Sequence, residues 1–98
     1  KRADAKAGLQ AAATWLERVS TSTGSYPTGS TLPPELTTVD SKAYSISYES
    51  DDGRSYELTA TPLGNQTQDG CKNFTLTNTG ETNVAGGATL SKDECWKR

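Results

Sequence analysis

The stretch KRADAKAGLQAAATWLERV, residues 1–19, decides how the first quarter of this chain folds and what the rest must pack against. Its apolar side chains recur at alternating spacings of four and three residues, which is the repeat of one face of an α-helix. The positions on this face are Ala5, Leu9, Ala12, Leu16 and Val19, with Ala13 beside them. The pattern predicts an N-terminal helix over residues 1–22 that packs on the rest of the domain.

This helix has no capping residue in front of it. Ser, Thr, Asp or Asn commonly precedes the first turn of a helix, because its side chain accepts a hydrogen bond from a free backbone N–H. Here the chain opens with Lys1, with neither a cap nor a Met. We therefore expect residues 1–22 to be the C-terminal half of a longer helix whose first half is missing from this chain.

Ser, Thr and Gly residues over 20–25, followed by Pro27, predict the end of the helix. Residues 23–42 then have the composition of a loop. Within it, Tyr26 and Leu32 are expected to pack down onto the domain, and Pro33 and Pro34 to stiffen the chain.

From Ala43 onward the apolar repeat changes from the helical period to two, which is typical of strands with one buried face. Two such segments flank SDDGRS, residues 50–55, and predict a hairpin. A third strand over 71–78 would turn Phe74 and Leu76 inward and Thr75 and Thr77 outward, and residues 81–90 would make at most a short edge strand. The fold class is α+β, with one helix on one face of a three- to four-stranded antiparallel sheet that spans residues 43–78.

The register of the hairpin can be predicted, because directly opposed residues of an antiparallel pair lie on the same face. The expected pairs are Tyr48 with Tyr56, Ile46 with Leu58 and Tyr44 with Ala60. This pairing leaves residues 51–53 as a three-residue loop with Gly53 in the left-handed conformation.

The hydrophobic fraction, 32% of 98 residues, is low for building a core, so additional stabilisation is expected. Cys71 and Cys95 could supply it as a disulfide that stabilises the fold by about 3–4 kcal/mol through its effect on the unfolded chain. Such a bond indicates an oxidising compartment, such as a periplasm or the cell exterior. A pair of free thiols is the alternative.

Catalysis is not expected, because the chain has no histidine and so lacks the residue of most triads, general bases and zinc sites. The nearest candidates for carboxylate catalysis or calcium binding surround the predicted hairpin. They are Glu49, Asp51, Asp52 and Glu57. An exposed acidic turn explains them better, since their spacing is not that of an EF-hand loop. We expect no metal, no cofactor and no small-molecule substrate.

Nucleic-acid binding depends on local charge, because the formal net charge is −2. A Cys71–Cys95 disulfide would draw cations together at one corner of the domain, namely Lys72, Lys92, Lys97 and Arg98. Asp69, Asp93 and Glu94 lie among them, so scattered solvating charges are the simpler interpretation. In the same region Trp96 could be a stacking platform for bases, but packing over the disulfide is favoured.

Taken in order along the chain, these parts resemble the soluble portion of type IV pilins, and most closely the minor pilins of the PilE type. The resemblance covers nearly the whole chain. It is carried by Arg2-Ala3-Asp4-Ala5, Glu17-Arg18 near the helix end, residues 56–62, Asp69 before Cys71, Leu76 with Gly80, and the terminal Cys95-Trp96.

The resemblance implies a non-enzymatic subunit that assembles with other pilins into a helical filament used for adhesion, twitching motility or DNA uptake. The precursor would be held in the bacterial inner membrane by the missing half of the helix, and the mature subunit would lie in an extracellular pilus. Residues 23–42 would be the αβ-loop, and residues 71–95, bounded by the disulfide, the D-region that distinguishes one pilin from another. No residue of the membrane anchor or of the precursor cleavage site is present in this chain.

Two alternatives follow from the same resemblance. One is a DNA receptor like the ComP-type competence pilins, which would use the Lys72, Lys92, Lys97 and Arg98 corner. Relatives in one well-known group of that type carry a second disulfide, whereas this chain has two cysteines. The other alternative is a pseudopilin of type II secretion, although the terminal Cys95-Trp96 favours the pilus.

Overall fold

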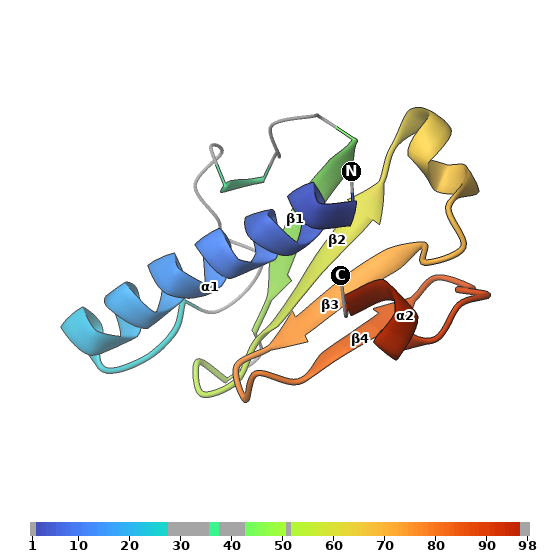
Figure 1. The fold of residues 1–98 in the computed structure, drawn as a ribbon. Helices are drawn as coiled ribbons and strands as arrows, with labels where there is room; N and C mark the ends of the chain where they lie inside the picture. The colour runs from blue at the N-terminus through green and yellow to red at the C-terminus, as the bar shows by residue number, and fades with distance from the viewer. Residues whose placement is uncertain (1, 28–35, 38–42, 51, 97–98) are drawn as a thin grey trace.

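The computed structural model describes residues 2–27, 36–37, 43–50 and 52–96. Within them, an N-terminal helix lies across one face of a four-stranded antiparallel sheet with strand order β1-β2-β3-β4 (Figure 1). The elements are α1 (Arg2–Thr23), β1 (Tyr44–Glu49), β2 (Glu57–Pro62), the 3-10 helix η2 (Gly64–Gln68), β3 (Asn73–Thr77), β4 (Thr82–Ala85) and α2 (Lys92–Trp96). The predicted α+β fold is confirmed.

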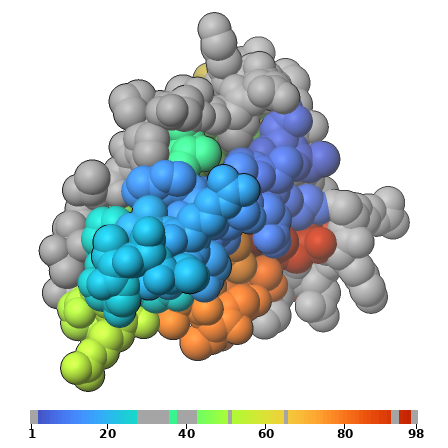
Figure 2. All heavy atoms as spheres, turned by 90° about the vertical axis from the view of Figure 1, so that its left-hand side faces the viewer, coloured from blue at the N-terminus to red at the C-terminus, as the bar shows by residue number. Residues whose placement is uncertain are grey.

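The helix α1 has the predicted apolar face, and it ends where the sequence indicates. Ala5, Leu9, Ala12 and Leu16 have no exposed surface, whereas Val19 is only half-buried. The backbone N–H of Gly24 donates to the carbonyl of Ser20 at 2.7 Å, and Gly24 has a φ of +89°. A glycine in this left-handed conformation is a common way to satisfy the last carbonyls of a helix. In the view of Figure 2 the cyan C-terminal end of α1 faces the reader, with orange atoms of the β3–β4 hairpin below it.

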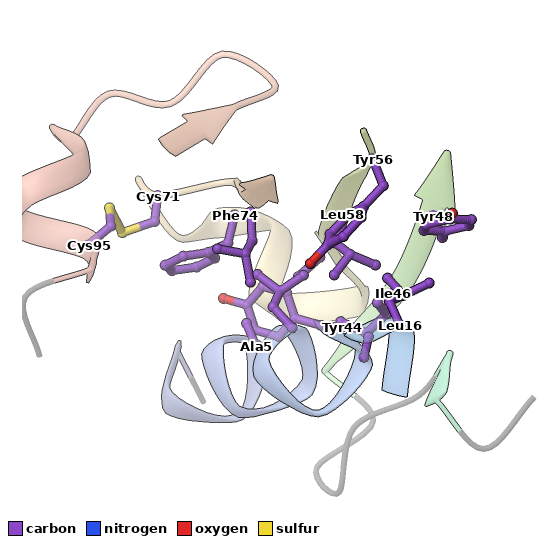
Figure 3. Close-up of a cluster of buried hydrophobic side chains, with 14 of the residues drawn as sticks. Ala5, Leu16, Tyr44, Ile46, Tyr48, Tyr56, Leu58, Cys71, Phe74 and Cys95 are labelled. Carbon is purple, nitrogen blue, oxygen red and sulfur yellow. A yellow bond between two sulfur atoms is a disulfide. The ribbon is translucent and has the colours of Figure 1, made fainter. Parts of the chain in front are cut away.

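The core lies between α1 and the alternate residues of the sheet that face it (Figure 3). Tyr44 and Phe74 meet edge to face with their ring centres 5.9 Å apart. The buried residues of the strands that face α1 include Tyr44, Ile46, Tyr48, Leu58, Ala60, Phe74 and Leu76. All seven were predicted to point inward. Leu32, also expected to pack on the domain, lies outside the described residues, whereas Tyr26 does pack against the core.

The predicted hairpin register is wrong by two residues. Tyr48 lies opposite Leu58, Ile46 opposite Ala60, and Tyr44 opposite Pro62. Because the shift is even, each side chain keeps its predicted face, so parity alone could not distinguish the two pairings. The strands end earlier, at the pair Glu49 and Glu57, and the connection between them is longer than three residues. The expected left-handed glycine is present, since Gly53 has a φ of +74°.

Thr75 was predicted to face away from the core, on the solvent side of the sheet. It alternates with the core residues of β3, but only 7% of it is exposed. β3 is an inner strand, and Thr75 lies between Thr59 of β2 and Asn83 of β4, whose side chains share its face. Neighbouring strands therefore cover this hydroxyl.

Two short helices occupy segments that were expected to be irregular. η2 lies in the predicted loop over residues 62–70, and α2 lies in the C-terminal tail. β4 is the short edge strand that was expected. Within the described part of the chain, no helix is both long enough and apolar enough to cross a membrane.

Candidate functional site

Cys71 and Cys95 form the predicted disulfide and join the beginning of β3 to α2 (Figure 3). Their Cα atoms lie 5.9 Å apart, and neither residue has exposed surface. The bond closes a separation of 24 residues along the chain. Residues next to either cysteine are consequently brought to one corner of the domain.

Lys72 follows Cys71 at this corner in an unusual backbone conformation. Its φ is +54°, and within the described part of the chain it is the only residue other than glycine with a positive φ. Its ammonium group donates a hydrogen bond to the carbonyl oxygen of Thr67 at 2.7 Å. The Lys72 side chain is thus held against η2.

Lys6 reaches the same corner from α1, although the sequence analysis did not include it among the candidate residues. Its Nζ donates to the carbonyl oxygen of Cys95 at 3.3 Å, across 89 residues of sequence. A cation at this position also interacts favourably with the C-terminal carbonyls of a helix. No local pattern could have indicated this contact, because it depends on how α1 and α2 pack.

The other predicted cations are only partly placed. Lys92 is the first residue of α2, the helix that carries Cys95. Lys97 and Arg98 lie outside the described residues, as do the side chains of Lys92 and Asp93. Of the four predicted residues, the structure therefore places the side chain of Lys72 at this corner.

The described acids of this corner accept hydrogen bonds from their neighbours. Glu94 accepts from the backbone N–H and the hydroxyl of Ser91, both at 3.3 Å. Asp69 accepts from the side-chain amide of Gln66 at 3.4 Å. These hydrogen bonds orient both carboxylates.

Trp96 is a packing residue, as the sequence analysis favoured. Its ring meets Phe74 edge to face with centroids 5.6 Å apart. Its indole N–H donates to the carbonyl oxygen of Asn83 at 2.8 Å, on the edge strand β4. With both its edge and its N–H engaged inside the domain, Trp96 is not arranged as a stacking platform.

η2 lies next to Lys72, and its described side chains, those of Gln66, Thr67 and Gln68, are polar. Leu63, the residue before η2, is 44% exposed. Among the described residues it is the only large hydrophobic one that is exposed to this extent. Thr67 and Gln68 are exposed as well. The sequence analysis treated this segment as an ordinary loop, because a five-residue helix has no periodicity that could be detected.

The opposite end of the sheet is acidic. Glu49 lies directly across from Glu57 at the end of the hairpin, and both line a hollow with Asp52 and Glu81. Backbone N–H groups of Arg54 and Ser55 donate to Asp52 and hold the pKa of its carboxyl below the ordinary value. The described residues contain no group of three or more acids, cysteines or histidines placed to hold a metal ion, and Asp51 is outside them.

Comparison with known families identifies the fold and the class of protein. Residues 1–75 match the family model of the type IV minor pilin ComP, described as a DNA uptake sequence receptor. This chain belongs to the ComP family of type IV minor pilins. A type IV pilin from Shewanella oneidensis has the same fold with a TM-score of 0.68 and 30% identity, over 91% of this chain and 93% of that one. A search of curated proteins found no match.

The predicted type IV pilin is therefore confirmed, and the matching family is the one that the sequence analysis gave as its DNA-receptor alternative. As a type IV minor pilin, the protein is a structural subunit of an extracellular pilus. The more specific assignment to the PilE type stays a prediction. The match to the ComP model includes Lys6, η2 and Lys72, but it ends before Lys92, Lys97 and Arg98.

Proposed function

We propose that this minor pilin binds double-stranded DNA on the pilus surface through the corner next to the disulfide. The proposed cations are Lys6 and Lys72, together with Lys92, Lys97 and Arg98 from the sequence prediction. The observation that carries the proposal is that a buried disulfide and the Lys6 contact bring Lys6 and Lys72 from different elements to α2. The family to which the chain belongs is described as a receptor for DNA uptake sequences.

Lysine side chains at one corner attract the phosphate backbone of DNA, and contacts to phosphates position a protein on the duplex. The net charge of −2 does not by itself oppose this, because contacts to phosphates depend on the local arrangement of charges and not on the total. The acidic end of the sheet lies at the other end of the strands and would repel phosphates there. DNA would then approach from one direction only.

The proposed function also covers the rest of the subunit. Residues 23–42 would be the αβ-loop and residues 71–95 the D-region, which carries Lys72 and Lys92 of the proposed DNA-binding cations. The precursor would be held in the inner membrane by a helical segment that continues α1 toward the N-terminus. The subunit would then act by assembly with other pilins and by binding DNA, without catalysis.

Binding can be tested by gel-shift titration of a short DNA duplex with the folded domain at low and moderate salt. We expect measurable affinity that falls as salt rises, and Lys72→Gln should weaken binding about three- to tenfold. The same substitution should reduce the slope of log affinity against log salt concentration by about one, which corresponds to the loss of one phosphate contact. Lys92→Gln and Lys97→Gln should behave in the same way.

Arg54→Gln is the matched control, because it also removes one positive charge but lies in the hairpin loop at the acidic end. It should leave the affinity unchanged. Absence of binding by the unmodified domain at low salt would contradict the proposed function, and equal losses in the Lys72 and Arg54 variants would contradict the proposed corner.

A further inference from the structure

The segment from Leu63 through η2 projects beyond the end of β2, at the end of the sheet where β3 begins and Lys72 lies (Figure 1). η2 is the gold coil in that view. It is the exposed element in direct contact with Lys72, through the bond from the lysine ammonium to the Thr67 carbonyl. A phosphate held by Lys72 would therefore lie beside η2.

η2 is held rigidly although it is short. The backbone N–H of Leu63 donates to the carbonyl of Ala43 at 2.7 Å, and the Thr67 hydroxyl donates to the carbonyl of Gly64 at 2.8 Å. The Gln66 amide reaches back to the hydroxyl of Tyr44, a fully buried core residue, at 3.0 Å. An element anchored at its beginning and tied to the core loses little further backbone entropy when it binds.

Two exposed side chains of this segment, Gln68 and Leu63, are not used inside the described part of the protein. The Gln68 side chain makes no hydrogen bond within the described part of the chain, so both its carboxamide donor and its acceptor are free. Leu63 leaves 44% of its surface exposed directly before the helix. The segment that Lys72 contacts through the Thr67 carbonyl therefore carries a free carboxamide and an exposed apolar side chain that the fold itself does not require.

The carboxamide of Gln68 and the apolar side chain of Leu63 are chemically complementary to the major-groove edge of an A·T pair. In the major groove an A·T pair presents the N7 acceptor and N6 donor of adenine and the methyl group of thymine. A glutamine carboxamide can bond to N7 and N6 together, and an apolar side chain can contact the methyl group. G·C pairs offer no methyl group, and guanine has acceptors at both positions.

From this juxtaposition we propose that Leu63 and η2 enter the major groove and read A·T pairs, with Gln68 contacting adenine and Leu63 contacting thymine. The inference rests on the proposed function, because Lys72 must first position the phosphate backbone. It adds to that function by assigning sequence reading to a different element from the one that supplies the cations. Leu63 and Gln68 are then specificity residues, whereas Lys72 contributes to affinity for any sequence.

The test uses fluorescence anisotropy with two duplexes of equal length, one of alternating A·T pairs and one of alternating G·C pairs. The domain should bind the A·T duplex about tenfold more tightly. Replacing adenine by 7-deaza-adenine should reduce affinity for wild type but not for Gln68→Ala. Replacing thymine by uracil, which lacks the methyl group, should reduce affinity for wild type but not for Leu63→Ala.

Gln10→Ala is the matched control, since it removes an exposed glutamine from α1 and should keep the full preference for A·T. Circular dichroism melting verifies that each variant is folded. If wild type binds both duplexes equally, or if the base analogues affect wild type and the variants alike, the inference is wrong although DNA binding stands. Absence of binding to either duplex would reject the proposed function itself, and this inference with it.

Discussion

At the scale of single residues, Ser50 explains why the hairpin connection is longer than the sequence indicates. Its hydroxyl donates to the carbonyl of Ser55 at 2.6 Å and accepts from the backbone N–H of Gly53 at 3.1 Å. Only 4% of Ser50 is exposed. The Ser50 hydroxyl thus takes the place of backbone hydrogen bonds that a tight turn would form between the strands. Strand pairing can therefore end at Glu49 and Glu57.

Replacing Ser50 by alanine should therefore lower the free energy of unfolding. The change leaves the backbone N–H of Gly53 and the carbonyl of Ser55 without their hydrogen-bond partner, which costs about 1–3 kcal/mol. Ser47→Ala makes the same chemical change in β1, the strand that Ser50 follows, where the hydroxyl is exposed and its bond to the carbonyl of Thr59 is long, at 3.4 Å. Urea unfolding should show a clear loss for the first variant and less than about 0.5 kcal/mol for the second. Equal losses would mean that Ser50 does not hold the loop.

At the scale of elements, three tyrosines tie α1, the segment after it and the hairpin together. Tyr26 meets Tyr56 edge to face with ring centroids 4.8 Å apart, and Tyr48 lies 5.9 Å from Tyr56. The Tyr26 hydroxyl donates to Glu17 of α1 at 2.9 Å, and the Tyr48 hydroxyl donates to the carbonyl of Pro27. The chain that leaves α1 is thereby fixed to β1 and β2 where the long predicted loop begins.

This cluster makes the fold sensitive to alkali. Burial, together with the nearby charges of Tyr26, Glu17 and Tyr48, raises the pKa of Tyr56 from 10.0 to about 12. A raised pKa means that the folded state retains a proton that the unfolded chain releases. This contribution is complete below the unfolded value of 10.0 and is lost as the pH rises through about 12.

We expect the free energy of unfolding to fall over this interval, and to fall less in Tyr56→Phe, which has no proton to lose there. Urea unfolding of both proteins at several pH values between 10 and about 12 measures the difference. An identical decline in the two proteins would show that other groups cause the sensitivity to alkali.

At the scale of the whole molecule, the charges are separated along the strands. Glu49 and Glu57 end the hairpin on one side, whereas Lys72 precedes β3 on the other. A strand of six residues such as β2 is roughly 20 Å long, which is more than twice the screening length of about 8 Å at physiological salt. The two ends therefore act almost independently, and a net charge of −2 describes neither of them.

The sequence allows the fold to be predicted wherever a local pattern specifies it. The spacing of Leu9 and Leu16 defines the helical face, and strand alternation defines the inward residues, because both repeats are set by the backbone itself. The register could not be predicted, since Leu58 and Tyr56 satisfy the same parity opposite Tyr48. Of the candidate site, Lys72 follows from the cysteine pairing, but the Lys6 contact depends on tertiary packing across 89 residues.

The central claim is that DNA binds at the end of the domain that carries η2, Lys72 and α2. It is tested most directly by NMR titration of the ¹⁵N-labelled domain with a short duplex at low salt. Amide shifts should concentrate in residues 63–72, in the turn of α1 around Lys6 and in α2, while the hairpin end around Glu49 and Glu57 should stay unchanged. Shifts centred on the hairpin end, or no shifts at saturating DNA, would contradict it.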